Sequence, residues 1–255
     1  MLAGTDHGSL IVNRFDYKPI GEDDGIGVGF NLLRNSCYET QEIGVGVAML
    51  DLARNFRGDG VVAVDCGANL GVMAVEWARA MTGWGRLIAF EAQERIFYAL
   101  AGNLALNNCF NAQARHAAVG AQCGTMSVPC PDYLRPGSFG SLELVKRTDN
   151  EFIGQEIDYG STAEIPCLTL DSLSLSRLDV LKIDVETMEM DVLNGAKETV
   201  RRCRPMMIVE SLKANKPELQ GWLEAAGYAV FEMGANFVAV HHADPARSLI
   251  QPAGA

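Results

Sequence analysis

The stretch that decides the fold reads Val61-Val62-Ala63-Val64-Asp65-Cys66-Gly67-Ala68-Asn69-Leu70-Gly71. Its four leading apolar residues predict a short strand that is buried on both faces of a sheet. Gly67 permits close backbone approach to a ligand, and Gly71 permits the following helix to pack against the strand. The stretch therefore predicts a strand, a tight turn and a helix, with a ligand site at the turn.

Three further apolar runs have the same form, and each ends in an acid. These runs and their acids are 87–90 with Glu91, 180–183 with Asp184, and 206–209 with Glu210. Segments of helical periodicity lie between the runs, which is typical of a parallel sheet covered on both faces. Apolar runs at 229–231 and 237–240 flank Gly234 and predict an antiparallel hairpin at the sheet edge. The predicted fold class is a doubly wound α/β domain with a mostly parallel sheet and a terminal antiparallel hairpin.

The 255 residues are predicted to form a single domain, residues 1–255. We expect an N-terminal extension to about residue 38 and a core from about residue 39 to 243. The most polar stretch, from about residue 129 to 165, is rich in Pro and Gly and predicts an irregular insert. Long loops inside compact domains are usually functional, so we expect the insert to shape acceptor binding.

The composition argues against several classes of protein. Apolar residues make up 48% of the chain and charged residues 21%, which is typical of a globular domain. The net charge of −11 opposes binding to nucleic acid and to anionic membranes. The seven cysteines form no C-x-x-C pair, and the N-terminus lacks a basic and apolar leader pattern. We expect a cytoplasmic protein with reduced thiols and no nucleic-acid or membrane partner; a homo-oligomer is compatible with the sequence.

The acids at the strand ends indicate the ligand. Ligands of open α/β sheets bind outside the carboxyl ends of the strands, where Asp65 and Glu91 are expected. Dinucleotide sites have G-x-G-x-x-G directly after the strand. Here Asp65 would repel a pyrophosphate, and it suits a ligand with an ammonium group or hydroxyls. Glu91 can accept both hydroxyls of a ribose, so the pattern favours S-adenosylmethionine as the cofactor.

The same residues, with segments further along, resemble the FkbM-type S-adenosylmethionine-dependent methyltransferases. The resemblance spans about residues 39–210 and is most specific at Lys182-Ile183-Asp184-Val185-Glu186. The other matching segments are 64–71, 90–92, 107–108, 168–173, Glu189, Leu193 and Gly195-Ala196. The resemblance implies a class I methyltransferase (Rossmann-like) fold and O-methylation of a hydroxyl on a small metabolite, such as a polyketide, a sugar or a related natural product. The family usually has glycine where this chain has Thr187, and we expect that side chain to narrow the pocket or change the accepted substrate.

Candidate site residues follow from the strand ends and from the resemblance. We expect the cofactor to contact Asp65, Gly67, Ala68, Asn69, Gly71, Glu91, Ala92 and Asp184. Asp184 and Glu186 are expected to be catalytic, because a carboxylate can take the proton of the acceptor hydroxyl. The acceptor, a small molecule with a hydroxyl group, is expected to contact Ser141, Glu210 and His241. No metal ion is expected, since the later strand end reads Glu210-Ser211 rather than the Asp-Asn pair of metal-dependent catechol-type enzymes.

Two other functions share parts of this pattern. An NAD(P)-linked oxidoreductase has a similar fold, but the chain lacks G-x-G-x-x-G after its first apolar run. A non-catalytic cofactor-binding protein would have a degenerate site, whereas Asp65, Glu91 and the segment 184–186 are all present. Methyl transfer is therefore the leading hypothesis.

Overall fold

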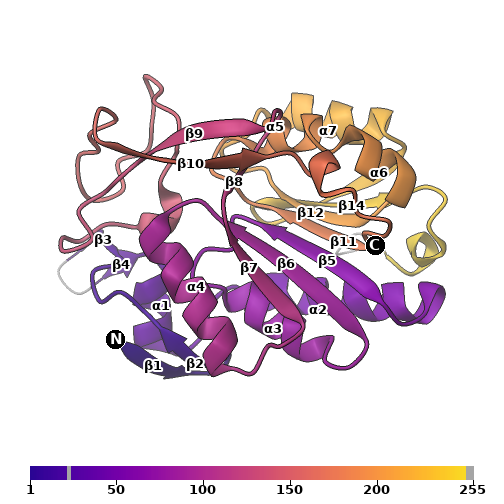
Figure 1. The fold of residues 1–255 in the computed structure, drawn as a ribbon, viewed down its shortest axis with the longest axis horizontal. Helices are drawn as coiled ribbons and strands as arrows, with labels where there is room; N and C mark the ends of the chain where they lie inside the picture. Colours follow the sequence, from indigo (N-terminus) through magenta and orange to yellow (C-terminus); the bar gives the residue numbers. More distant parts are fainter. Residues whose placement is uncertain (22–23, 251–255) are drawn as a thin grey trace.

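A seven-stranded sheet forms the centre of the computed structural model, which describes residues 1–21 and 24–250 (Figure 1). The strand order is β13-β14-β12-β11-β5-β6-β7. Its strands are β5 (Val61–Cys66), β6 (Gly85–Glu91), β7 (Ala112–His116), β11 (Val180–Ile183), β12 (Met206–Glu210), β13 (Tyr228–Met233) and β14 (Asn236–His241). The pairs from β12 to β7 are parallel, and β14 is antiparallel to both β12 and β13. The predicted doubly wound sheet and terminal hairpin are confirmed.

Helices cover both faces of this sheet. Alternate residues of β5 point to opposite faces: Val61 and Ala63 join one core, and Val62 and Val64 join another. The first core lies under α1 (Val28–Asn35), α2 (Thr40–Arg57), α3 (Val72–Ala80) and α4 (Glu94–Leu106). The second lies under α5 (Glu189–Asn194), α6 (Lys197–Cys203) and α7 (Lys216–Ala225), on the upper side of the sheet in Figure 1. Burial on both faces explains the unbroken apolar strands.

The predicted insert at 129–165 is shorter than expected. Pro129 ends β9 (Gly124–Pro129), and β10 (Thr162–Leu168) pairs with β9 in antiparallel register. With β8 (Ala118–Val119), these strands form a separate three-stranded sheet. Three of the six residues of β9 and the first three residues of β10 are exposed, so neither strand shows the continuous apolar run that marks a strand buried on both faces. The irregular segment is therefore 130–161, which contains one short helical turn, η1 (Phe139–Ser141).

The N-terminal extension is built into the domain. Its strands are β1 (Leu2–Thr5), β2 (Gly8–Ile11), β3 (Lys18–Pro19) and β4 (Gly25–Ile26). Leu10 and Val12 are fully buried in the first core. His7 is buried, and its Nε2 accepts the backbone N–H of Tyr38 at 3.1 Å, immediately before α2. The extension thus supports the start of α2.

Two short helical turns complete the described chain, namely η2 (Asp171–Leu173) and η3 (Pro245–Leu249). Within residues 1–21 and 24–250, none of the helices combines the length and apolar character that crossing a membrane requires.

Candidate functional site

A cavity lies where β5, β6 and β11 end. It holds about 1130 Å³ of space, part of it open to solvent. This is of the order of small-molecule sites, roughly 300–1,000 Å³. Its wall includes the strand-end acids Asp65, Glu91 and Asp184, together with Tyr38 before α2 and Ser141 from the insert. Parallel strands bring their carboxyl ends to one edge, which is why acids far apart in the sequence meet here.

The turn after β5 fits closely against the end of β11. Gly67 has a φ of +83°, and a Cβ built on it would lie 1.7 Å from the carbonyl oxygen of Asp184. Only glycine fits at this position, because any side chain would overlap backbone atoms. Gly67, Ala68 and Asn69 all line the cavity, as expected for a turn that approaches a ligand.

Gly71 allows the helix after the turn to pack closely. Its φ is +86°, and a Cβ there would lie 2.6 Å from Leu100 Cδ1 on α4. Gly71 is not among the residues that line the cavity, and its expected contact with the cofactor stays a prediction.

Asp65 presents a buried carboxylate to the cavity. The residue is fully buried, and neither side-chain oxygen has a hydrogen-bond partner among the described residues. Burial raises the pKa of Asp65 to about 6, while Lys182 on the neighbouring strand lowers it. A buried carboxylate without partners is costly, so this position favours a ligand that brings hydrogen-bond donors or positive charge.

Glu91 is held at the cavity wall by two backbone groups. Its Oε2 accepts the N–H of Asn69 at 3.0 Å, and its Oε1 accepts the N–H of Gln93 at 2.8 Å. Burial raises the pKa of Glu91 to about 7. Each carboxylate oxygen can accept a further bond. Glu91 and its neighbour Ala92 both line the cavity.

Asp184 is neutralised from within the sheet. Its Oδ2 lies 2.8 Å from Nζ of Lys182, a buried lysine of β11. Burial lowers the pKa of Lys182, but the surrounding carboxylates, Asp184 foremost, raise it well above its usual value. The ion pair therefore fixes the position of the Asp184 carboxylate at the cavity wall.

Glu186 and Glu210 form a second acidic pair nearby. Glu186 lines the cavity, and its Oε2 lies 2.6 Å from Nζ of Lys213, in the loop after β12. Glu210 is outside the cavity wall, and its buried Oε2 has no hydrogen-bond partner in the part of the chain that the structure describes. Burial raises the pKa of both glutamates, and the Asp184 carboxylate raises it further. The pair can hold a proton close to the cavity.

The predicted acceptor contacts divide into two groups. Ser141 lines the cavity, and its hydroxyl is 3.0 Å from that of Ser138. His241 lies elsewhere: β14 runs antiparallel to β12, so Glu210 pairs with Asn236 and His241 falls at the opposite edge of the sheet. There its ring packs edge-on against Tyr228, with ring centroids 5.2 Å apart. The prediction for His241 is therefore wrong, because an antiparallel strand ends opposite the carboxyl ends of the parallel strands, away from the cavity.

Thr187 does not narrow the cavity, because it is not part of the lining. Its φ is +81°, which explains a preference for glycine at this position. Its buried hydroxyl oxygen has no hydrogen-bond partner among the described residues. Backbone strain therefore accounts for the preference for glycine, and an effect of this side chain on the accepted substrate stays a prediction.

Thr187→Gly is expected to raise the free energy of unfolding by about 1 kcal/mol. Left-handed backbone strain in a β-branched residue costs roughly 1–3 kcal/mol, and the greater freedom of glycine in the unfolded chain offsets part of the gain. Urea denaturation measures the change. Ser174→Gly, at an exposed residue with a φ of +49°, is the comparison for strain without a buried hydroxyl. A loss of stability in Thr187→Gly would show that the side chain is used.

The functional side chains that sequence reasoning missed are Lys182, Gln93 and Lys213. The sequence did contain a feature that marks Lys182, since it is the one charged residue within the apolar run 180–183. Gln93 hydrogen-bonds the backbone oxygen of Phe139 at 2.8 Å and so joins the Glu91 turn to the insert. Lys213 lies in a loop with no periodic pattern, and its partner in the insert is distant in sequence.

Comparison with known proteins identifies the class. The model of the Methyltransferase FkbM domain matches residues 65–230. With the strand order described above, this match defines a class I methyltransferase fold. Because the match covers more than half of the chain, the protein belongs to the FkbM methyltransferase family. This leaves the NAD(P)-linked oxidoreductase without support.

Individual relatives are distant. Methyltransferase sdnD of Sordaria araneosa is 24% identical over 190 residues, and the match covers 66% of this chain and 73% of that protein. The crystal structure of Methyltransferase FkbM from Methylobacillus flagellatus KT aligns with a TM-score of 0.49 and 14% identity, over 72% of this chain and 44% of that chain. This chain therefore corresponds to less than half of that protein. Magnesium protoporphyrin IX methyltransferase from Synechocystis PCC 6803, solved with bound SAM, aligns with a TM-score of 0.46 and 10% identity, over 79% of this chain and 78% of that one.

Proposed function

We propose that this protein transfers a methyl group from S-adenosylmethionine to a hydroxyl oxygen of a small metabolite, such as a polyketide, a sugar or a related natural product. The observation that carries the proposal is one cavity lined by two sets of acids. Asp65 and Glu91 stand at the ends of β5 and β6, and Asp184 and Glu186 follow β11. Family membership supports methyl transfer, and the acids support the choice of cofactor and acceptor.

The residues present fit S-adenosylmethionine. Asp65 offers a buried carboxylate whose oxygens have no partner among the described residues, as a cationic or donor-rich ligand requires. Glu91 offers acceptor capacity beyond its two backbone bonds, which suits the hydroxyls of a ribose. The residues that would hold the cofactor are Asp65, Gly67, Ala68, Asn69, Glu91, Ala92 and Asp184.

The chain itself would act by position and by proton transfer. S-adenosylmethionine supplies a methyl group already activated by its sulfonium centre. Alignment of the reacting groups can contribute about 7–11 kcal/mol to such a reaction. Glu186 lines the same cavity as the cofactor residues and would take the proton of the acceptor hydroxyl. Ser141 lines the wall on the insert side and would contact the acceptor.

A reaction without a metal ion fits the charge arrangement. Asp184 pairs with Lys182 at 2.8 Å, and Glu186 pairs with Lys213 at 2.6 Å. A carboxylate that already bonds an ammonium group offers less charge to a divalent cation. Within the described residues, no group of three or more His, Cys, Asp or Glu side chains is placed to hold a metal ion.

Glu91→Ala is expected to weaken binding of S-adenosylhomocysteine, the demethylated cofactor, by about 1–3 kcal/mol, because hydroxyl donors lose a charged acceptor. Isothermal titration calorimetry measures the change. Glu94→Ala is the matched control, since Glu94 is an exposed acid at the start of α4. Unchanged affinity in both Glu91→Ala and Asp65→Ala would contradict the assignment.

Mass spectrometry of a metabolite pool, with labelled cofactor, should detect a product heavier by one CH₂.

A further inference from the structure

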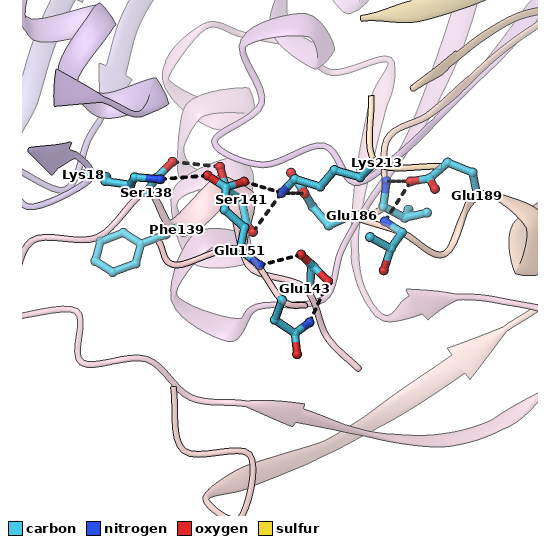
Figure 2. Close-up of polar contacts among 12 residues, drawn as sticks. Lys18, Ser138, Phe139, Ser141, Glu143, Glu151, Glu186, Glu189 and Lys213 are labelled. Carbon is cyan, nitrogen blue, oxygen red and sulfur yellow. Dashed lines mark hydrogen bonds and ion pairs between the residues drawn. The ribbon is translucent and has the colours of Figure 1, made fainter. Parts of the chain in front are cut away.

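Lys213 joins two segments that are far apart in the sequence. Its Nζ lies 2.6 Å from Glu186 Oε2 in the turn after β11, and 2.8 Å from Glu151 Oε2 in the insert (Figure 2). The side chains of Lys213 and Glu186 are each only 17% exposed, so this pair is shielded from bulk water, whereas the side chain of Glu151 is 35% exposed. Such partly buried pairs contribute more than surface pairs do. Lys213 also donates to the backbone oxygen of Ser141 at 3.4 Å.

The insert is organised to present Glu151 at this point. Glu143 accepts the backbone N–H of Glu151 at 3.0 Å and bonds the side chain of Asn150 at 2.6 Å (Figure 2). On its other side, Glu151 pairs with Lys18 of β3 at 3.0 Å. The segment around Glu151 therefore has internal bonds that hold it in place, and Lys213 links it to the turn after β11.

Glu186 faces an acidic surrounding in which Lys213 supplies the balancing charge. The charged groups around it are Asp184 at the end of β11, Glu210 of β12, Glu189 of α5 and Lys213 itself. Burial raises the pKa of Glu186, Asp184 raises it further, and the Lys213 ammonium lowers it. The Lys182 ammonium bonds Asp184 at 2.8 Å, so its charge is directed to a different carboxylate. Removing Lys213 would therefore raise the pKa of Glu186 further and favour the protonated carboxyl, which cannot accept a proton.

We propose that Lys213 is a positioning residue for the acceptor side of the cavity: its ammonium group favours the charged form of Glu186 and anchors the insert at the same point. This inference rests on the proposed function, in which Glu186 takes the proton of the acceptor hydroxyl. One ammonium group thus couples the state of the base to the position of the wall that carries Ser141. Loosening of the insert alone does not weaken the charge stabilisation of Glu186. That stabilisation is lost only if Lys213 moves away from Glu186 together with the insert.

The test observes Glu186 directly and needs no acceptor. The protein is labelled with ¹³C at the glutamate carboxyls, and the Glu186 signal is assigned by its loss in Glu186→Gln. Its NMR titration midpoint is then compared in the wild type, Lys213→Met and Lys213→Arg. We expect Lys213→Met to raise the midpoint by about 1–3 pH units, the effect of removing a nearby opposite charge. Lys213→Arg should bring the Glu186 midpoint most of the way back to the wild-type value. Lys197→Met, at an exposed lysine of α6, should leave the midpoint unchanged.

Hydrogen exchange of the insert tests the second half of the proposal. Amides of 142–153 should exchange faster in Lys213→Met and in Glu151→Gln. Glu151→Gln keeps the Lys213 to Glu186 pair, so it should loosen the insert without raising the Glu186 midpoint. An unchanged midpoint in folded Lys213→Met overturns the proposal, as does a midpoint in Lys213→Arg as high as in Lys213→Met. Unchanged exchange of 142–153 in Lys213→Met overturns the anchoring half. Failure of the wild type to bind S-adenosylhomocysteine contradicts the proposed function instead, because neither the Glu186 midpoint nor the exchange measurement needs the cofactor.

Discussion

Gly67→Ala is expected to lower the free energy of unfolding by about 3–5 kcal/mol, through backbone strain and forced overpacking together. The added Cβ would lie 1.7 Å from the carbonyl oxygen of Asp184, and 2.8 Å from the carbonyl carbon of that residue. Both are backbone atoms, so no side-chain rotation relieves the overlap. Either the turn after β5 or the end of β11 must move, and both line the cavity. Binding of S-adenosylhomocysteine should fall with stability.

Gly83→Ala is the matched control for this prediction. Gly83 has the same φ of +83°, but nothing lies within 4 Å of the position of its Cβ. It should lose only the strain contribution, about 1–2 kcal/mol. Urea denaturation gives the free energy of unfolding for both variants. Equal losses of unfolding free energy in Gly67→Ala and Gly83→Ala would mean that the turn after β5 shifts at little cost. The close approach of this turn to the end of β11 would then not determine the geometry of the site.

The sequence was most informative where one short segment contains the whole signal. A run of four apolar residues ending in an acid specifies both a buried parallel strand and the position of its carboxylate. This is why Asp65, Glu91 and Asp184 could be placed at one edge before the strand order was known. Gly67 was likewise predictable, because the need for close backbone approach is local.

Features that depend on partners distant in sequence could not be predicted. Strands β9 and β10 pair with each other and are exposed over part of their length, so neither has a continuous apolar run of its own. Lys213 gains its role from Glu151, which belongs to the irregular insert. His241 shows a different limit: its hairpin was predicted, but the strand direction decides which edge its last residue reaches.

Glu186→Gln is expected to reduce kcat for methyl transfer about 10²–10⁴-fold, the usual contribution of a positioned general base. The amide keeps the shape of the side chain but cannot take the proton of a hydroxyl. Burial and Asp184 raise the pKa of Glu186, and a base must be deprotonated to act. The wild-type rate should therefore rise with pH at values above the ordinary glutamate range, and Glu186→Gln should lose that rise. Initial rates on the acceptor found by mass spectrometry measure both effects.

Two comparisons distinguish this role of Glu186 from its alternatives. Glu198→Gln removes an exposed acid that pairs with Arg201 at 2.7 Å, and it should leave kcat unchanged. Asp184→Asn tests the second catalytic candidate; a larger loss there than in Glu186→Gln would transfer the base role to Asp184. Exhaustive EDTA treatment should leave the wild-type rate intact, because lysines already neutralise both carboxylates. Activity that disappears with EDTA and returns with Mg²⁺ would instead make Asp184 a metal ligand, since Mg²⁺ binds through one or two carboxylates and water.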